Sequence, residues 1–158
     1  MHIRERLRSE EGFTLVELMV VVLIIAILIA IAIPTFLGAR TRAQDRAVQS
    51  DLRNALTAAK VHYADANSDY GFVVADLDAV HASLDFVAGV PLIDQVGFTV
   101  FANEDGTPDQ AVMFLALSQS GTWFCLWDEA SGSMSRTYFG QSAAAATFVS
   151  RADCTNGW

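Results

Sequence analysis

The chain has 158 residues, of which 53% are hydrophobic and 18% are charged, and its formal net charge at pH 7 is −8. The charge is unevenly divided, because the stretch from Val61 to Trp158 carries two basic against twelve acidic residues, a balance of −10. A surface this acidic repels polyanions. The composition therefore argues against a protein that binds nucleic acid directly through a basic face.

An uninterrupted apolar run near the N-terminus predicts a membrane-spanning helix. Leu18 to Ile33 are 16 consecutive apolar residues, and Glu17 is the only charged residue among the 27 residues from Phe13 to Ala39. A helix of that length spans about 40 Å, which exceeds the roughly 30 Å hydrocarbon core of a bilayer. Burying the Glu17 carboxylate in lipid costs free energy unless it reaches the headgroups or binds a partner of opposite charge. The apolar run alone does not distinguish between these two possibilities.

The residues around Glu17 add a more specific pattern. The segment Gly12-Phe13-Thr14-Leu15-Val16-Glu17, followed by the apolar run, resembles the cleavage and methylation segment of type IV prepilins with a short leader. Pro34 is the twenty-second residue counted from Phe13, where members of this family usually carry a proline. The resemblance extends from Glu11 to about Tyr70 and is only architectural beyond that point.

The resemblance implies a processing pathway and a division of the chain. Residues 1–12 are expected to be a leader, which a prepilin peptidase removes by cutting between Gly12 and Phe13 before the new amino group of Phe13 is methylated. Residues 13–39 would form the transmembrane and assembly helix, and residues 40–158 the globular head. In the filament, Glu17 is expected to pair with the Phe13 amine of a neighbouring subunit, since the pair neutralises two charges that an apolar core penalises.

The leader departs from the family pattern and does not fix the orientation of the helix. Glu10 and Glu11 precede Gly12, where the family often has a basic residue. Three arginines precede the apolar run and three follow it closely, so the positive-inside rule gives a tie: Arg4, Arg6 and Arg8 before it, and Arg40, Arg42 and Arg46 after it. The cytoplasmic N-terminus is expected from the resemblance and from cysteines that need an oxidising exterior.

The helix is expected to continue beyond the apolar run as an amphipathic helix to about Asn67. Apolar residues recur there at helical spacing: Val48, Leu52, Leu56, Ala59 and Tyr63. Pro34 and Gly38 interrupt this length, and a proline inside a helix removes one backbone hydrogen bond and clashes with the preceding turn. We expect one continuous helix kinked near Pro34, with two separate helices as the alternative. The family suggests that unwinding at Pro34 lets a filament extend under load.

The remainder predicts an α+β fold, with the helix packed on an antiparallel sheet of about four strands. Asn67 to Gly71 form a turn cluster. Phe72 to Val90 are ambiguous between a short helix, with Leu77, Val80, His81 and Leu84 on one face, and the variable loop that the family has here. Four runs rich in aromatic and aliphatic residues read as the strands of a meander: Val96 to Phe101, Ala111 to Leu117, Thr122 to Trp127 and Met134 to Phe139.

Cys125 and Cys154 are the only cysteines of the chain. About 90 residues follow Tyr70, a size at which one hydrophobic core is only modestly stabilising. A disulfide would close a loop of about 30 residues and stabilise the head by roughly 3 to 4 kcal/mol. Two free thiols are the alternative, and a metal site needs more ligands than this pair offers. In pilins such a pair encloses an exposed and variable C-terminal segment.

The sequence contains no recognisable catalytic motif, so we expect neither an enzyme nor a cofactor. His2, His62 and His81 are scattered, and Asp76 and Asp78 would offer calcium only two loop carboxylates, which are usually solvated. Five basic residues between Gly38 and Lys60 would face acidic heads in a filament or lipid headgroups, or simply solvent: Arg40, Arg42, Arg46, Arg53 and Lys60. The three aromatic residues Trp123, Phe124 and Trp127 are expected in the core or an interface.

The expected function is a structural subunit of a type IV pilus. Its partners would be the prepilin peptidase, other copies of itself, minor pilins, the pilus assembly machinery and, before assembly, the membrane. The precursor would cross the cytoplasmic membrane once and later join an extracellular pilus. One alternative is a pseudopilin of a type II secretion or DNA-uptake system. Another is a membrane-anchored receptor or adhesin that never polymerises, and a secretory signal peptide cut after Ala32 is a third reading of the N-terminus.

Overall fold

The computed structural model describes residues 12–65, 68–103, 105–131 and 136–158, so most of the predicted leader, 1–11, lies outside the described residues. The chain divides into two compact units, the first ending at Ala39 and the second comprising Arg40–Trp158. Helix α1, Leu15–Asp65, continues from one unit into the other. With the sheet described below, this confirms the α+β class and the long apolar N-terminal helix.

Pro34 lies inside α1, so the expectation of one continuous helix is confirmed. A proline at this position leaves the carbonyl of Ala30 without its usual amide partner. The next residue, Thr35, donates a hydrogen bond from its hydroxyl to the carbonyl oxygen of Ile31 at 3.1 Å. Such back-bonding by threonine is a frequent companion of bent helices. The kink at Pro34 and Gly38 itself stays a prediction.

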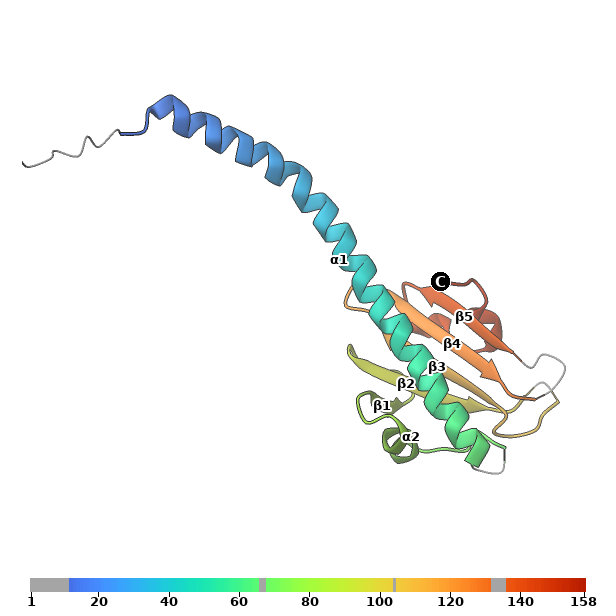
Figure 1. Cartoon of the computed structure of the whole chain (residues 1–158). Helices are drawn as coiled ribbons and strands as arrows, with labels where there is room; N and C mark the ends of the chain where they lie inside the picture. The colour runs from blue at the N-terminus through green and yellow to red at the C-terminus, as the bar shows by residue number, and fades with distance from the viewer. Residues whose placement is uncertain (1–11, 66–67, 104, 132–135) are drawn as a thin grey trace, which may run out of the picture. The chain divides into compact units, whose positions relative to one another are not determined.

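The second unit contains one five-stranded sheet with the strand order β1-β2-β3-β4-β5. The pairs β2–β3, β3–β4 and β4–β5 are antiparallel, whereas β1 and β2 are parallel. The bounds of the elements are α2 Val74–Val80, β1 Asp85–Ala88, β2 Gln95–Phe101, β3 Ala111–Leu117, β4 Trp123–Glu129, β5 Thr137–Ser142, and the short 3-10 helices η1 Ala145–Thr147 and η2 Arg151–Cys154. Figure 1 shows the second half of α1 crossing one face of this sheet.

The sheet corrects two expectations, since it has five strands rather than about four and is not antiparallel throughout. The extra strand, β1, has only four residues and gives too little periodicity to be recognised in a sequence. It lies within Phe72 to Val90, where the short helix also exists as α2 with Leu77 fully buried. The last strand was expected from Met134 to Phe139, but β5 runs from Thr137 to Ser142. Its end is set by β4, since Ser142 still pairs with Trp123, and this pairing overrides the weak strand propensity of the residues after Phe139.

The face of the sheet toward α1 carries the larger core. Side chains alternate along the strands, as the pleat requires. From α1, Leu52 and Ala59 are fully buried in this core, and Val48, Leu56 and Tyr63 pack against it, which confirms the predicted amphipathic face. The sequence pattern missed two fully or nearly fully buried alanines. The strand residues of this core are Phe86, Val96, Phe98, Val112, Phe114, Ala116, Phe124 and Leu126, and the missed helix residues are Ala55 and Ala58.

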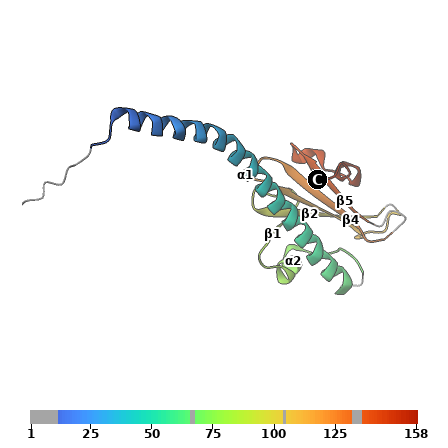
Figure 2. The same ribbon diagram turned by 45° about the horizontal axis from the view of Figure 1, so that its top comes forward.

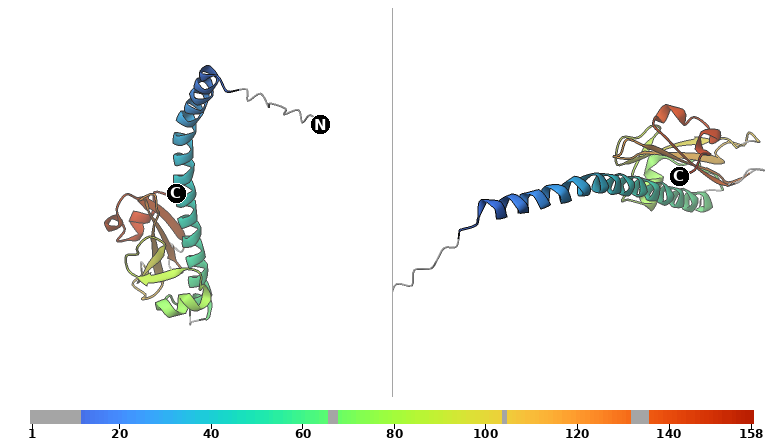
Figure 3. Two further views of the ribbon diagram at one scale, coloured as in Figure 1. Left: turned by 90° about the vertical axis from the view of Figure 1, so that its left-hand side faces the viewer. Right: turned by 90° about the horizontal axis from the view of Figure 1, so that it is seen from above.

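The opposite face of the sheet is covered by the C-terminal segment. Met113 and Leu115 of β3 and Trp127 of β4 form a second core there with Phe148, which follows η1. The right-hand view of Figure 3 shows the head in three layers, with α1 on one side of the sheet and the short C-terminal helices on the other. Because both faces are covered, β3 and β4 read as continuous apolar runs instead of alternating ones.

A buried carboxylate ties the helix to the sheet at Asp128. Its side chain is 3% exposed and lies 3.2 Å from the ammonium of Lys60 in α1. The hydroxyls of Tyr70 and Thr137 both donate to it at 2.5 Å. Burial and the hydrogen bond to Asp128 raise the pKa of Tyr70 well above its ordinary value, so the phenol stays a donor. This network joins α1, the segment after it, β4 and β5. No pattern in the sequence predicts it.

The six residues 89–94 between β1 and β2, which we name the crossover loop, return the chain to the start of a parallel strand. Parallel neighbours usually need about a dozen residues for this. The short loop lies directly on β2, where a Cβ on Gly97 would be 2.1 Å from the carbonyl oxygen of Gly89 and 2.5 Å from Cδ of Pro91. Only glycine at position 97 permits this approach.

We expect Gly97→Ala to lower the free energy of unfolding by at least about 2 kcal/mol, since backbone on both sides must move to admit the methyl group. Urea unfolding of the full chain in detergent measures this. Gly71→Ala is the matched control, because the nearest neighbour of its Cβ is the side-chain oxygen Oδ1 of Asp69 at 3.1 Å, which needs to shift by only a few tenths of an ångström. Equal midpoints for Gly97→Ala and wild type would show that the loop is not packed on β2.

The pKa values of Asp51 and Asp153 are shifted in opposite directions, so the two residues should change the pH dependence of stability in opposite ways. Desolvation, followed by the nearby charge of Asp94, raises the pKa of Asp51 on α1, while His81 acts in the other direction. The folded head therefore holds the Asp51 proton more tightly than the unfolded chain, and stability is lost as the pH rises through this pKa. The Ser150 hydroxyl, followed by the Val149 amide, lowers the pKa of Asp153, so its contribution is lost as the pH falls.

Accordingly, Asp51→Asn should raise the unfolding midpoint at pH 7 and leave it unchanged at pH 3, where the wild-type carboxyl is already protonated. Asp153→Asn should lower the midpoint at pH 7 because the asparagine loses the charge-assisted hydrogen bonds. Thermal unfolding of the full chain in detergent at the two pH values tests both. A lower midpoint for Asp51→Asn at pH 7 contradicts the assignment.

Candidate functional site

The predicted cleavage site lies on an exposed segment before α1. Gly12 and Phe13 precede the helix, and the side chain of Phe13 is 87% exposed. A Cβ built on Gly12 would meet nothing within 4 Å. A glycine has no Cβ, so its backbone can adopt the extended form in which a protease cleft binds a substrate.

Glu17 and Thr14 form a reciprocal cap at the start of α1. The amide and the hydroxyl of Thr14 donate to Oε2 of Glu17 at 2.9 and 2.8 Å, and the amide of Glu17 donates to the Thr14 hydroxyl at 3.2 Å. This is a capping box, which satisfies amides that the first helical turn leaves unpaired. The sequence pattern Thr-x-x-Glu at Thr14 could have revealed it, but the reading of Glu17 as an assembly residue overlooked this local role.

The apolar side chains of the first unit have no protein covering. From Leu15 to Leu37, the large hydrophobic residues are all exposed, and the most apolar window of α1 has no buried residue. By length and composition α1 is able to cross a membrane, and it is the one such helix among the described residues. Apolar area of this extent is stable only against lipid or against other apolar helices.

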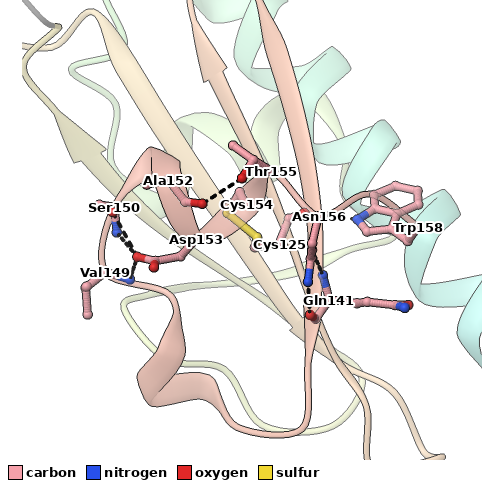
Figure 4. The surroundings of a disulfide bond; sticks show 10 residues. All are labelled: Cys125, Gln141, Val149, Ser150, Ala152, Asp153, Cys154, Thr155, Asn156 and Trp158. Atoms are coloured by element: carbon pink, nitrogen blue, oxygen red, sulfur yellow. Dashed lines mark hydrogen bonds between the residues drawn. A yellow bond between two sulfur atoms is a disulfide. The ribbon is translucent and has the colours of Figure 1, made fainter.

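The second predicted site, Cys125 and Cys154, is a disulfide with a Cα–Cα distance of 5.8 Å. Cys125 lies on β4 and Cys154 at the end of η2, as Figure 4 shows. Between them lies β5, whose Gly140 is opposite Cys125 in the register. A Cβ on Gly140 would be 2.7 Å from Cα of Cys154, so the glycine lets η2 lie against the sheet.

The residues after the disulfide cover the free edge of β5. The side-chain amide of Asn156 accepts a hydrogen bond from the Gln141 amide at 2.9 Å and donates to the Gln141 carbonyl at 2.8 Å (Figure 4). The indole of Trp158 donates to the carbonyl of Cys125 at 3.1 Å. An exposed strand edge is a template for unwanted pairing, and this segment occupies it.

Two residues of the predicted basic stretch are engaged within the head. The Arg53 guanidinium lies 4.7 Å from the ring centre of Trp158, and Lys60 pairs with Asp128. Arg40, Arg42 and Arg46 are exposed.

The remaining calcium alternative finds little support. Asp76 accepts a hydrogen bond from the amide of Val73 at the start of α2, and it lies 3.8 Å from Nε2 of His62 on α1. Figure 2 shows α2 beside this part of α1. Among the described residues, no group of three or more His, Cys, Asp or Glu side chains is arranged to hold a metal ion.

Comparison with known proteins agrees with the N-terminal pattern. Residues 7–33 match the family model of the prokaryotic N-terminal methylation motif. Over 62 residues the chain is 45% identical to the type IV wide pilus major component PilA4 of Thermus thermophilus, a match that covers 39% of this chain and 47% of the relative. The chain thus spans about half the length of that curated relative. No solved structure matches the chain.

The head does not enter the family-model match, which ends at Ile33. Its architecture nevertheless agrees with the resemblance, since a long apolar helix packs its second half on a mostly antiparallel sheet and a disulfide fastens the C-terminal segment. The methylation motif, the identity to a pilus component and this fold together support a type IV pilin.

Proposed function

We propose that the chain is a structural subunit of a type IV pilus that is cleaved between Gly12 and Phe13, methylated on Phe13 and polymerised through α1. One observation carries the proposal. Glu17 is the single charged residue at the beginning of a helix whose apolar side chains are otherwise bare. Lipid accommodates such a helix before assembly, and the helices of other copies accommodate it afterwards.

The chemistry of Glu17 suits a second partner besides Thr14. A carboxylate offers about four lone-pair positions, and the two hydrogen bonds from Thr14 both reach Oε2. Cleavage after Gly12 would create an ammonium on Phe13, which is able to bind the Glu17 carboxylate of a neighbouring copy. In an apolar filament core, the pair would set the axial position of each subunit, because a misplaced subunit leaves two buried charges unpaired.

The two ends of the chain would then have separate tasks. The motif and the apolar helix fit a membrane-anchored precursor that later becomes part of a surface pilus. We infer that the N-terminus is cytoplasmic and that the head lies outside, where the oxidising environment preserves the Cys125–Cys154 bond. Prepilin peptidase, minor pilins and the membrane assembly machinery would be the partners at successive stages.

Mass spectrometry of the mature N-terminus tests the proposal. We expect a chain that begins at Phe13 and carries one methyl group on its amine. A chain that retains Met1 would favour a membrane-anchored receptor or adhesin. A chain that begins at Ile33 would indicate a secretory signal peptide.

Sheared surface filaments distinguish the remaining possibilities. We expect this chain to be an abundant component of long filaments that are released by shear. A methylated chain that stays in the envelope, with none in the sheared fraction, would instead favour a pseudopilin of a secretion or DNA-uptake system.

A further inference from the structure

The crossover loop exposes three large apolar side chains within four residues. Val90 is 66%, Leu92 72% and Ile93 48% exposed. Single apolar residues are common on protein surfaces, but a contiguous group marks a place where another molecule binds. The rest of the head is rich in acidic residues, so an apolar loop on its surface is unusual. We therefore expect another molecule to cover this loop.

The loop is held in one conformation. The Gly89 amide donates to the carbonyl of Phe98 at 2.8 Å, and the Leu92 amide donates to Oε1 of Gln95 at 3.0 Å. Pro91 is buried against Gly97, so the loop has little freedom to fold its apolar side chains away. A rigid surface loses little entropy when it binds, which favours a docking role.

The surroundings of the loop select the chemistry of the occupant. Asp94 at the end of the loop and Asp85 at the start of β1 are both exposed. An apolar group flanked by carboxylates favours a partner that is basic at its rim, and it disfavours an anionic lipid surface.

The same chain presents a matching surface on α1. Arg40, Arg42 and Arg46 are exposed, and so is the small residue Ala43 among them. Residues three apart lie on neighbouring positions of a helix face, so Arg40, Ala43 and Arg46 share one side of α1. The alanine leaves room for an apolar side chain between two guanidinium groups.

We propose that the crossover loop of one copy binds the Arg40–Arg46 segment of a second copy. Leu92 then lies on Ala43, and Asp94 faces the arginines. The two surfaces differ, so the contact is heterologous and repeats from copy to copy, which builds a helical filament instead of a closed dimer. The inference rests on the proposed polymerisation and names the contact between heads that accompanies it.

Cysteine cross-linking in assembled filaments tests this contact. The full-length chain carrying both Leu92→Cys and Ala43→Cys is produced in cells that assemble filaments, and the sheared filaments are oxidised. We expect a ladder of covalent multimers on a non-reducing gel, and only monomers from either single variant. The control pair is Val149→Cys with Ala43→Cys, because Val149 is as exposed, at 69%, but lies in the C-terminal segment.

A second variant tests the charge complementarity. Asp94→Asn removes the charge and keeps a residue that tolerates the positive φ of 65° at this position. We expect several-fold fewer filaments than wild type, with the amount of methylated subunit in the membrane unchanged. Asp109→Asn, which neutralises another exposed aspartate with a positive φ, of 57°, should leave the yield unchanged.

The outcomes separate this inference from the proposed function. Normal filaments without a ladder overturn the head contact and leave polymerisation through α1 intact. A ladder of equal strength from the Val149 control pair also overturns it, because the cross-links would then be unspecific. Protection of Leu92→Cys from an aqueous maleimide in membranes, without a ladder in filaments, would assign the loop to lipid. Absence of filaments from the wild-type chain would refute the proposed function itself.

Discussion

Glu17→Gln is expected to give a precursor that is inserted, cleaved and methylated but yields at least about tenfold fewer filaments. The amide oxygen still accepts hydrogen bonds from Thr14, so the cap of α1 is kept. The Phe13 ammonium of the neighbouring copy loses its counter-ion, and an unpaired charge in an apolar interior costs about 3 kcal/mol or more. Filament yield per methylated subunit, from shearing and mass spectrometry, is the quantity to measure.

Thr14→Ala is the matched control, because it removes the two hydrogen bonds of the cap that involve the Thr14 hydroxyl and keeps the carboxylate. Loss of a helix cap costs about 1 kcal/mol, which a long membrane helix tolerates. We therefore expect near-normal filaments from Thr14→Ala and few from Glu17→Gln or Glu17→Ala. The reverse order would mean that Glu17 acts by capping the helix and not by pairing with Phe13.

Removal of the disulfide by Cys125→Ser with Cys154→Ser is expected to lower the free energy of unfolding by about 3 to 4 kcal/mol. The bond joins residues 29 positions apart, so it restricts a large part of the unfolded head. It also holds η2 against β5 at Gly140. Among the described residues, no other disulfide joins the C-terminal segment to the sheet. Urea unfolding of the full chain in detergent gives the difference.

Reduction of the wild-type protein should reproduce the unfolding midpoint of the double serine variant. If reduced and oxidised wild-type protein unfold at the same urea concentration, the disulfide does not stabilise the head. A double variant that is much less stable than the reduced protein would instead show that the buried serine hydroxyls cause the loss, since both cysteines are fully buried.

The prediction of the fold succeeded where a feature is local. Sixteen apolar residues in a row predict a membrane-length helix without knowledge of any partner, and the spacing of Leu52, Leu56 and Ala59 predicts which side of that helix is buried. Strands β2, β3 and β4 were found within one or two residues, because their aromatic and aliphatic runs are long.

The prediction failed where distant segments decide the structure. The four-residue β1 exists because it pairs with β2, and β5 extends to Ser142 because β4 offers partners that far. Neither pairing leaves a periodic signal in the strand itself. The same holds for Asp128, whose partners come from 58 residues before it and nine after it.

The sequence by itself determined the membrane-length helix and predicts the roles of Gly12, Phe13 and Glu17, because both follow from the order of residues along the chain. Only the tertiary structure decided that Gly97 and Gly140 are required for close packing and that the crossover loop faces solvent. The reason is physical. Insertion and cleavage depend on consecutive residues, whereas burial and close approach depend on which segments the fold brings together.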